Sequence, residues 1–509
     1  MREESLRKHA GSLYACRPFG HKPSCSSGYL SCSFACPVTG GRVTQEKRPR
    51  QQKLVGRSSL GRWPAMSWKE ALIGRALASD AGYEFLRYQC EEIGPRMAGT
   101  AAEIRARDWI CQQLQGMDYQ VTLEPFAYPQ WVPGEVGLEV LTPVRRRIPC
   151  LPLGWAGPGE ATSSMVSAGY GLRSDFGAAS VARQIVLVKN GAPAGQRAIH
   201  RSEKYALAQS GGAAALVLMR EHPLGVVGIG SVGLSGQLGC IPAVSVSFED
   251  GSFLARCLER GPVTATVKMA SASRPGTSWN LRATLPGAAL AHEKVVICAH
   301  YDSWYICPGA HDNANGVAVM LDLARILRGF PGARSFEFLA LGVEELGLFG
   351  SYHHAAAHRD ELASVAGVLN LDSLCCYQGD KLLLCNGHPA LAEFSRRLLS
   401  DLLPDVNVNT RINCYSDHFP FFLQGVPAMH FLAWGRDFYS AYNHTAYDTL
   451  DKVTPHNIRE ATLWAGLVAM ELAQRPDLPF GHLTPDEVKR AIDAQELRSG
   501  LELAGRYPQ

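Results

Sequence analysis

The sequence predicts an α/β fold in which a mixed, mostly parallel central sheet is flanked by helices and interrupted by an inserted β-rich domain. In the second half of the chain, short apolar runs typical of buried strands alternate with longer helical patterns, as in folds where helices cover a parallel sheet. A stretch of short β-like runs and Gly-rich turns separates two such segments. The predicted strands of the sheet are Val295–Ala299, Phe336–Leu341, Val368–Leu371 and Ala428–Leu432.

The first folded segment begins with helical patterns. An apolar pattern over residues 68–94 predicts helix and stops at a Gly-Pro pair. Thr100 and Glu103 have the spacing of a capping box, in which each side chain accepts a hydrogen bond from a free amide of the first turn. They predict a second helix that ends near Gly116. Residues 119–126 alternate in polarity and predict a strand.

Residues 129–274 are predicted to form the inserted domain. Runs at 184–188, 214–219 and 241–248 predict strands, and residues 202–210 predict a helix. No cluster of His, Cys, Asp or Glu with ligand spacing occurs in this stretch. We therefore expect a lid or an interaction module without chemistry of its own.

The main domain is predicted to comprise residues 66–128 and 275–475, and residues 476–509 a helical C-terminal extension. The extension opens with a second capping box, Thr484–Glu487, which has a proline at the first helical position. The helices predicted after the strands of the main domain cover 317–327, a segment after Gly350, 390–403 and 456–473.

The first 65 residues differ in composition from the rest. They contain 12 Lys/Arg against 3 Asp/Glu, a net charge of +9, which leaves −6 for the remainder. They are rich in Ser, Gly, Pro and Cys without periodicity, which predicts a disordered basic tail; a functional start at Met66 remains open. The mildly acidic remainder argues against a nucleic-acid-binding protein.

Membrane and export signals are not evident in the sequence. No apolar run reaches the ~18 residues needed to cross a bilayer, and no apolar core followed by small residues marks a secretory signal. The four cysteines in the first 40 residues have neither zinc-finger nor C-x-x-C spacing, and many of the other 11 lie inside apolar runs. This pattern predicts buried, reduced thiols, with a disulfide framework as the alternative. We expect a cytoplasmic protein, with secretion as the alternative.

One stretch places an imidazole and two carboxylates where a strand gives way to a helix. His300 and Asp302 directly follow the strand at 295–299, and a Gly-containing loop then leads to Asp312 before a helix begins at Gly316. In open α/β sheets, ligands bind at this edge. Imidazole and carboxylate are also the groups that bind zinc.

Three later segments supply further candidate ligands. Glu344 and Glu345 follow the second predicted strand, Asp372 ends the third, and His444 lies after the fourth. Taken singly, a Glu pair is usually a solvated loop, an Asp a helix cap and a His structural. Because all of them follow buried strands of one sheet, we interpret them as a set.

This set predicts a site for two metal ions. Two imidazoles and three carboxylates can hold two ions when one carboxylate bridges. Glu344 then remains free to take a proton from metal-activated water, and Asp302 can orient the ring of His300. The predicted ligands are His300, Asp312, Glu345, Asp372 and His444. The histidines predicted to lie at the surface or behind the ligands are His311, His353, His354, His358 and His418.

The motifs occur in the order found in the co-catalytic di-zinc metallopeptidase family, which this chain resembles. That family includes leucyl aminopeptidases, aminopeptidase Y, carboxypeptidase Q and glutamate carboxypeptidase II. The inserted region resembles the protease-associated domain of many members, most clearly at Ile241–Ser245. Two positions depart from the family pattern, His311 and Asn315, and neither is a ligand. The matching motifs are His300–Ser303, Gly309–Gly316, Glu344–Ser351, Asn370–Asp372, Ser416–Phe421 and Asn443–Thr449.

The resemblance implies a role for each ligand. Asp312 would bridge two Zn²⁺ ions. His300 and Asp372 would complete one site, and Glu345 and His444 the other. The family commonly has a cis peptide bond after the bridging aspartate.

The resemblance also implies an activity. The chain would be a zinc exopeptidase, with an aminopeptidase favoured, that hydrolyses N-terminal residues of peptides through a metal-bridging hydroxide. Glu344 would be the general base, Asp302 would orient His300, and Tyr415 is a candidate to stabilise the oxyanion.

Two alternatives remain open at this point. A carboxypeptidase or dipeptidase on the same scaffold would need a cation for the substrate carboxylate, for which Arg411 and Arg436 are candidates. A non-catalytic receptor-like binding protein is disfavoured, because all five ligands and Glu344 are present. A peptide substrate is expected, and a monomer and a dimer are both compatible with the sequence.

Overall fold

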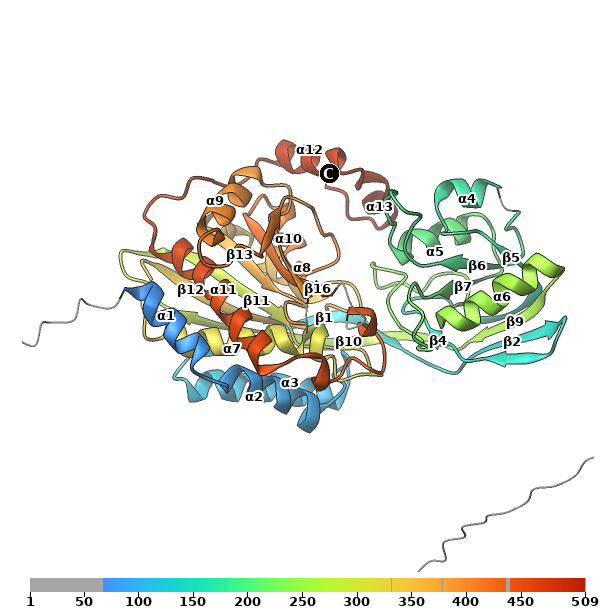
Figure 1. The fold of residues 1–509 in the computed structure, drawn as a ribbon, viewed down its shortest axis with the longest axis horizontal. Helices are drawn as coiled ribbons and strands as arrows, with labels where there is room; N and C mark the ends of the chain where they lie inside the picture. Colours follow the sequence, from blue (N-terminus) through green and yellow to red (C-terminus); the bar gives the residue numbers. More distant parts are fainter. Residues whose placement is uncertain (1–66, 179, 331, 377–378, 436–439, 509) are drawn as a thin grey trace, which may run out of the picture. The chain divides into compact units, whose positions relative to one another are not determined.

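The computed structural model describes residues 67–508, except 179, 331, 377–378 and 436–439. These residues form two eight-stranded mixed sheets with their helices (Figure 1). The predicted tail, Met66 and Arg436 lie outside the described residues. Among the described residues, no helix has the length and hydrophobicity needed to cross a bilayer.

The main sheet is mixed and mostly parallel, as the sequence predicts. In spatial order its strands are β1 (Val121–Val132), β10 (Ala272–Leu285), β12 (Arg334–Leu341), β11 (Leu290–His300), β13 (Val365–Leu371), β16 (Ala428–Gly435), β14 (Gly379–Leu384) and β15 (Asn407–Asn409). The central strands β12, β11, β13 and β16 run parallel to one another. The pairs β1–β10, β10–β12 and β14–β16 are antiparallel. The four predicted strands lie within these four parallel strands.

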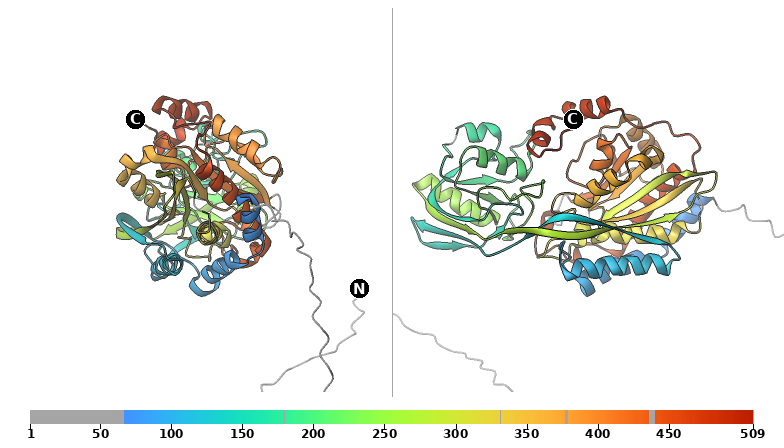
Figure 2. Two further views of the ribbon diagram at one scale, coloured as in Figure 1. Left: turned by 90° about the vertical axis from the view of Figure 1, so that its left-hand side faces the viewer. Right: turned by 180° about the vertical axis from the view of Figure 1, so that it is seen from behind.

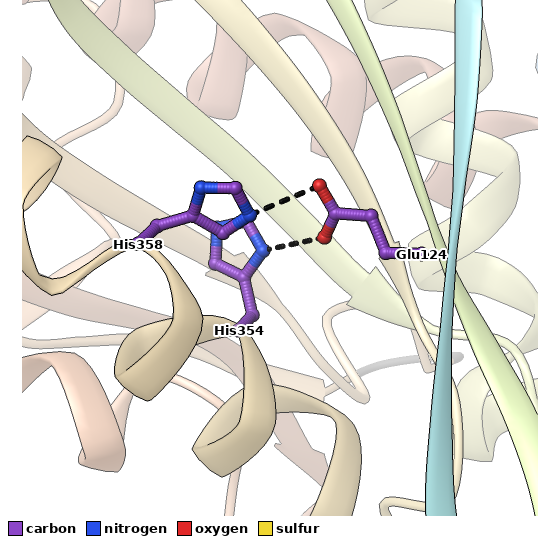
Figure 3. A group of neighbouring side chains, drawn as sticks. All are labelled: Glu124, His354 and His358. Atoms are coloured by element: carbon purple, nitrogen blue, oxygen red, sulfur yellow. Dashed lines mark hydrogen bonds and ion pairs between the residues drawn. The ribbon is translucent and has the colours of Figure 1, made fainter.

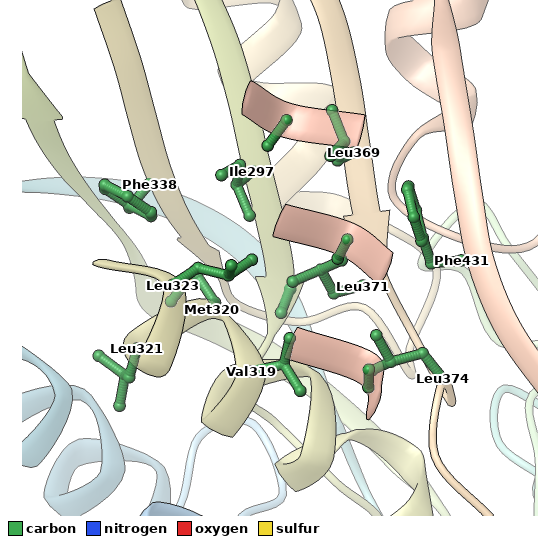
Figure 4. Close-up of a cluster of buried hydrophobic side chains, with 14 of the residues drawn as sticks. Ile297, Val319, Met320, Leu321, Leu323, Phe338, Leu369, Leu371, Leu374 and Phe431 are labelled. Atoms are coloured by element: carbon green, nitrogen blue, oxygen red, sulfur yellow. The ribbon is translucent and has the colours of Figure 1, made fainter. Parts of the chain in front are cut away.

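Both faces of the central strands are buried, which explains why their sequences are continuously apolar rather than alternating. Along β11, Val295 and Ile297 pack into one hydrophobic cluster, whereas Val296 and Cys298 pack into another on the opposite face. Figure 4 shows part of the first cluster, where Ile297 faces side chains such as Met320. The sheet is therefore the middle layer of three.

Helices cover both faces of the sheet (Figures 1 and 2). The helices that contribute to the first cluster are α1 (Trp68–Leu77), α2 (Ala81–Tyr88), α3 (Ala101–Gly116), α7 (Asn315–Leu327), α9 (Pro389–Leu399) and α11 (Pro455–Gln474). The other face is covered by α8 (Phe349–Ala357), α10 (Phe419–Leu423), α12 (Pro485–Ala494) and α13 (Arg498–Leu503). Short π- and 3-10-helical turns cover Gln89–Ile93, Ala310–Ala314, Arg359–Ser364, Ser440–Tyr442 and Leu450–Lys452.

Two helix predictions need correction. The pattern over 68–94 is not one helix, because the chain breaks after α1 and restarts at Ala81, whose amide donates to Ser79 Oγ at 3.2 Å. The predicted capping box of α3 forms only by half. Thr100 Oγ1 accepts the amide of Glu103, but the Glu103 carboxylate instead accepts the amide of Gly99 and the hydroxyl of Ser278.

The inserted domain is built on the second sheet. In spatial order its strands are β3 (Arg146–Ile148), β2 (Val136–Thr142), β9 (Thr264–Met269), β5 (Gly159–Ser167), β6 (Ile185–Lys189), β7 (Ala215–Met219), β8 (Ala243–Val246) and β4 (Leu151–Pro152). Its helices are α4 (Arg173–Ala178), α5 (Arg201–Ser210) and α6 (Phe248–Arg260). The strands and the helix predicted here correspond to β6, β7, β8 and α5.

The two domains are joined by a long antiparallel ribbon. Strands β1 and β10 pair continuously from the main sheet outward, with Tyr128 opposite Gly276 and Pro129 opposite Pro275. The predicted boundaries, at 128/129 and 274/275, fall inside this ribbon. All 11 cysteines of the described residues are free thiols.

Candidate metal centre

The structure brings the five predicted ligands together at the carboxyl edge of the main sheet. They form two groups, His300–Asp312–Asp372 and Asp312–Glu345–His444, and within each group the possible ligand atoms lie within 4.8 Å of one another. Asp312 belongs to both groups. The arrangement therefore has the connectivity of two metal sites that share one carboxylate.

Asp312 presents one oxygen to each group. Its Oδ1 lies 3.1 Å from His300 Nε2, and its Oδ2 lies 3.1 Å from His444 Nε2. Asp372 Oδ1 lies 3.6 Å from His300 Nε2, and Glu345 Oε2 lies 3.1 Å from His444 Nε2. Each imidazole thus faces two carboxylates through the same nitrogen.

The backbone at Asp312 is fixed by a residue that the sequence reasoning missed. The carboxylate of Asp448 accepts the amides of His311 and Asp312, at 2.7 and 3.0 Å. The bond between Asp312 and Asn313 is a cis peptide, as the resemblance implied. Asp448 follows His444 by four residues. Its position in the same motif as this ligand was the one feature of the sequence that could have pointed to it.

Asp302 has a wider role than orienting His300. His300 Nδ1 donates to the main-chain oxygen of Asp302 at 3.2 Å and lies 3.5 Å from its carboxylate. That carboxylate accepts the amides of Glu344 and Glu345, at 3.0 and 3.3 Å. Asp302 therefore ties the end of β11 to the loop that follows β12.

Asp372 is held from two sides. Its carboxylate accepts the hydroxyl of Ser416, whose oxygen in turn accepts the Nδ2–H of Asn370 at 2.6 Å. His430 Nε2 lies 3.1 Å from the main-chain oxygen of Asp372. His430 is on β16 and was not singled out in the sequence, because a lone histidine inside an apolar strand carries no ligand pattern.

The centre concentrates negative charge in a buried space. Burial raises the pKa of Glu344 well above its ordinary value, although the charge of His300 partly offsets it. Burial likewise raises the pKa of Glu345 to about 7 and that of Asp417 to about 7. Burial disfavours the protonated form of His444, but the carboxylates of Glu345 and Asp312 favour it more strongly and raise its pKa to about 9.

These residues fit a pair of divalent cations. Buried carboxylates are stable as anions only when paired with cations or protons. Glu345 Oε1 is buried and has no hydrogen-bond partner among the described residues, so it is an oxygen available to a metal. The two-imidazole, three-carboxylate donor set is of the kind that zinc prefers.

His444 is oriented by the inserted domain. Its Nδ1 lies 3.2 Å from the main-chain oxygen of Ile229, and the amide of Ile229 donates to the main-chain oxygen of His444 at 2.8 Å. Because Nδ1 is bound to this carbonyl oxygen, the ring is oriented so that Nε2 points toward the carboxylates of Asp312 and Glu345. The inserted domain thus helps to build the centre.

A cavity of about 220 Å³ opens onto the centre, and Glu344, Glu345, Asp312 and Asp372 lie in its wall. The inserted domain contributes Arg201, and the C-terminal extension contributes Arg506. Arg506 Nη2 donates to the main-chain oxygen of Gly347 at 2.5 Å, while its buried Nη1 has no partner among the described residues.

Both arginines were missed, because neither stands in a recognisable motif. The inserted domain contributes to the wall of the site, since Arg201 lines the same cavity as the ligands, and the expectation that it carries no chemistry of its own stays a prediction.

The remaining predicted residues have mixed positions. Tyr415 lines the cavity, but its hydroxyl donates to Glu203 Oε1 at 3.4 Å and its ring stacks on His200. Its role at the oxyanion stays a prediction. Arg411 is exposed and lines a neighbouring cavity together with Tyr415.

The histidines predicted to be surface residues or residues behind the ligands divide into two kinds. His311 and His418 are buried and bond to Cys375 and Asn370. His354 and His358 lie apart from the centre and form a separate group with Glu124, which is inside β1 rather than at a strand end, and His353 is exposed.

Comparison with known proteins gives two family matches. Residues 280–468 match the model of peptidase family M28, and residues 156–254 match the PA domain. The first match contains all five predicted ligands, and the second lies within the inserted domain.

Relatives are similar over most of the folded chain. Aminopeptidase YwaD of Bacillus subtilis (strain 168) is 28% identical over 391 residues, which cover 74% of this chain and 81% of that protein. Carboxypeptidase Q of Xenopus laevis is 25% identical over 306 residues, 58% of this chain and 65% of that protein.

Among solved structures, the zinc aminopeptidase BSAP from Bacillus subtilis superposes with a TM-score of 0.62 and 25% identity. The superposition covers 79% of this chain and 97% of that one. The fold, the arrangement of ligands and the two matches agree: residues 280–468 form a domain of peptidase family M28, and residues 156–254 match the PA domain inserted before it.

Proposed function

We propose that the protein is a zinc-dependent aminopeptidase whose centre holds two Zn²⁺ ions. The observation that carries this proposal is the carboxylate of Asp312, which offers one oxygen to each of two ligand groups in the wall of one cavity. Glu344 lies in the same wall and belongs to neither group. The site therefore offers metal ligands and a separate base side by side.

Zinc, when bound, polarises the scissile carbonyl and makes a water molecule more acidic. The side chains of the protein supply the proton transfers and the positioning. Glu344 accepts the proton of the attacking water on its carboxylate and passes it to the leaving amine. Asp302 holds this base in place, because its carboxylate binds the amides of Glu344 and Glu345.

The named relatives favour an exopeptidase that acts on the N-terminus of its substrate. YwaD and BSAP are both named aminopeptidases, which favours cleavage at the N-terminus.

A carboxypeptidase is the second candidate. One relative is named carboxypeptidase Q. Among the described residues, the cations that could recognise a substrate carboxylate are Arg201 and Arg506, which line the cavity, whereas the predicted Arg411 lines a neighbouring one. The other predicted cation, Arg436, lies outside the described residues. The metal ligands themselves do not discriminate between the two activities.

Product analysis separates the two candidates. The zinc-loaded protein is incubated with short peptides, some N-acetylated and some C-amidated, and the products are identified by mass spectrometry. We expect loss of residues from free N-termini only, abolished by a chelator and restored by zinc. Release from C-termini would instead establish the carboxypeptidase. No cleavage by protein with a full zinc content would remove the proposal.

A further inference from the structure

We propose that Glu124, His354 and His358 form an additional site for a divalent transition metal such as zinc, which shares no residue with the proposed catalytic centre. Glu124 comes from β1, His354 from α8, and His358 ends that helix. Figure 3 shows the two imidazoles side by side, both directed at the carboxylate. Their spacing of four residues places both rings on one face of the helix.

The three side chains converge on a common point. His354 Nδ1 lies 3.0 Å from Glu124 Oε2, and His358 Nε2 lies 3.0 Å from Glu124 Oε1. One atom from each residue can be chosen so that all three lie within 4.8 Å of one another. Two imidazoles and one carboxylate are a protein ligand set known for zinc, with a fourth position left for water.

The far side of the His358 ring supports a ligand role independently. His358 Nδ1 lies within hydrogen-bond distance of Glu361 Oε1, at 3.0 Å, and His354 Nε2 lies farther from its carboxylate, 3.8 Å from Glu337 Oε1. Histidines that bind metals typically donate their second N–H to a carboxylate, which fixes the tautomer and orients the ring. A separate carboxylate lies behind each of the two rings.

The group is also preorganised and partly shielded. The side chains of His354, Glu124 and His358 are 3%, 12% and 18% exposed. Burial opposes ionisation of Glu124, but the bond to His354 and the nearby positive charges lower its pKa to about 2. The carboxylate is therefore in the ionised form that a metal requires.

Two basic side chains compete with the metal and limit its affinity. Arg282 Nε donates to Glu124 Oε1 at 2.7 Å, so Oε2 is the oxygen left for a metal. Lys294 bonds to Glu337 and Glu361 at 3.2 and 2.5 Å. The three carboxylates still exceed the two cations by one charge, which leaves the site attractive to a divalent ion.

A bound ion would join β1 to α8. The helix α8 begins at Phe349, shortly after Glu344 and Glu345, whereas β1 belongs to the ribbon that leads to the inserted domain. The expected effect is stabilisation of the fold, because binding to the native state alone raises its stability. Catalytic turnover should change little.

The experiment counts metal in the full chain. Zinc-loaded wild type, His358→Asn and Glu124→Gln are dialysed against metal-free buffer, and zinc per chain is measured by mass spectrometry. We expect the wild type to hold one more zinc than either variant, with peptidase activity within about twofold. His353→Asn is the matched control, because His353 is an exposed histidine of the same helix that stacks on Phe126.

A second measurement distinguishes a metal site from a plain cluster of ion pairs. Zinc binding to protein already saturated at the catalytic centre is followed by calorimetry in wild type and Glu361→Gln. Loss of this carboxylate should weaken zinc about 10- to 100-fold. Equal zinc content in wild type, His358→Asn and Glu124→Gln, or no further zinc uptake by the saturated wild type, would overturn the proposal.

Discussion

At the scale of single residues, the two adjacent glutamates divide the work. Glu345 contacts His444, whereas Glu344 stays outside both ligand groups. We predict that Glu344→Gln lowers kcat about 10²- to 10⁴-fold, since an amide cannot accept the proton. Zinc content should stay at the wild-type level, because no ligand is removed. The measurement is steady-state kinetics paired with zinc analysis of the same samples.

An exposed glutamate provides the control for this substitution. Glu135 lies on the surface just before β2, and Glu135→Gln should leave both kcat and zinc content unchanged. If Glu344→Gln kept wild-type turnover, the general base would have to be sought elsewhere, with Asp417 as the next buried carboxyl near the centre.

At the scale of elements, the N-terminus of α3 contains a pH-sensitive contact. Glu103 is 1% exposed, and burial raises its pKa to about 7, although bonds from Ser278 and Gly99 partly offset this. The folded state therefore holds this proton more tightly than the unfolded state does. The raised pKa stabilises the folded state by on the order of 3 kcal/mol below about pH 4.5. This stabilisation is lost as the pH rises through about 7.

We predict from this that the melting temperature of the wild type falls more between pH 5 and pH 8 than that of Glu103→Gln. The amide introduced by this substitution stays neutral across the range, so the difference between the two proteins isolates the contribution of Glu103. Glu92→Gln, on an exposed turn before α3, should follow the wild type. Parallel melting curves for wild type and Glu103→Gln would show that this carboxyl titrates normally.

At the scale of the whole molecule, the cavity is composite. The inserted domain supplies Arg201 to its wall, and the oxygen of Ile229 orients His444. We predict that Arg201→Gln lowers kcat/KM about 10- to 100-fold, the equivalent of one charged hydrogen bond. Zinc content should not change, because Arg201 is not a ligand. The measurement is kcat/KM of both proteins on short peptides with one to three residues after the scissile bond.

The matched control is Arg256→Gln, an exposed arginine on α6 of the same domain. It should behave as wild type in both kinetics and zinc content. Equal kcat/KM for wild type and Arg201→Gln would mean that Arg201 makes no contribution to substrate binding or turnover.

The sequence by itself determined the central strands and the five candidate ligands. Continuous apolar runs are characteristic of strands buried on both faces, and parallel strands bring the residues that follow them to one edge. His300 directly follows such a run, Asp372 ends one, and Glu345 comes four residues after the end of another. Their convergence could be predicted, because it depends on local order and on the direction of the strands.

Only the tertiary structure decided the contacts between segments that share no local pattern. Glu124 lies 230 residues before His354, and Arg201 and Ile229 reach the centre from another domain. The same holds for the carboxylates of Asp302 and Glu103. Which backbone amides they bind depends on which segments pack next to them. Periodicity and spacing describe one segment at a time, whereas these positions follow from how separate layers pack against one another.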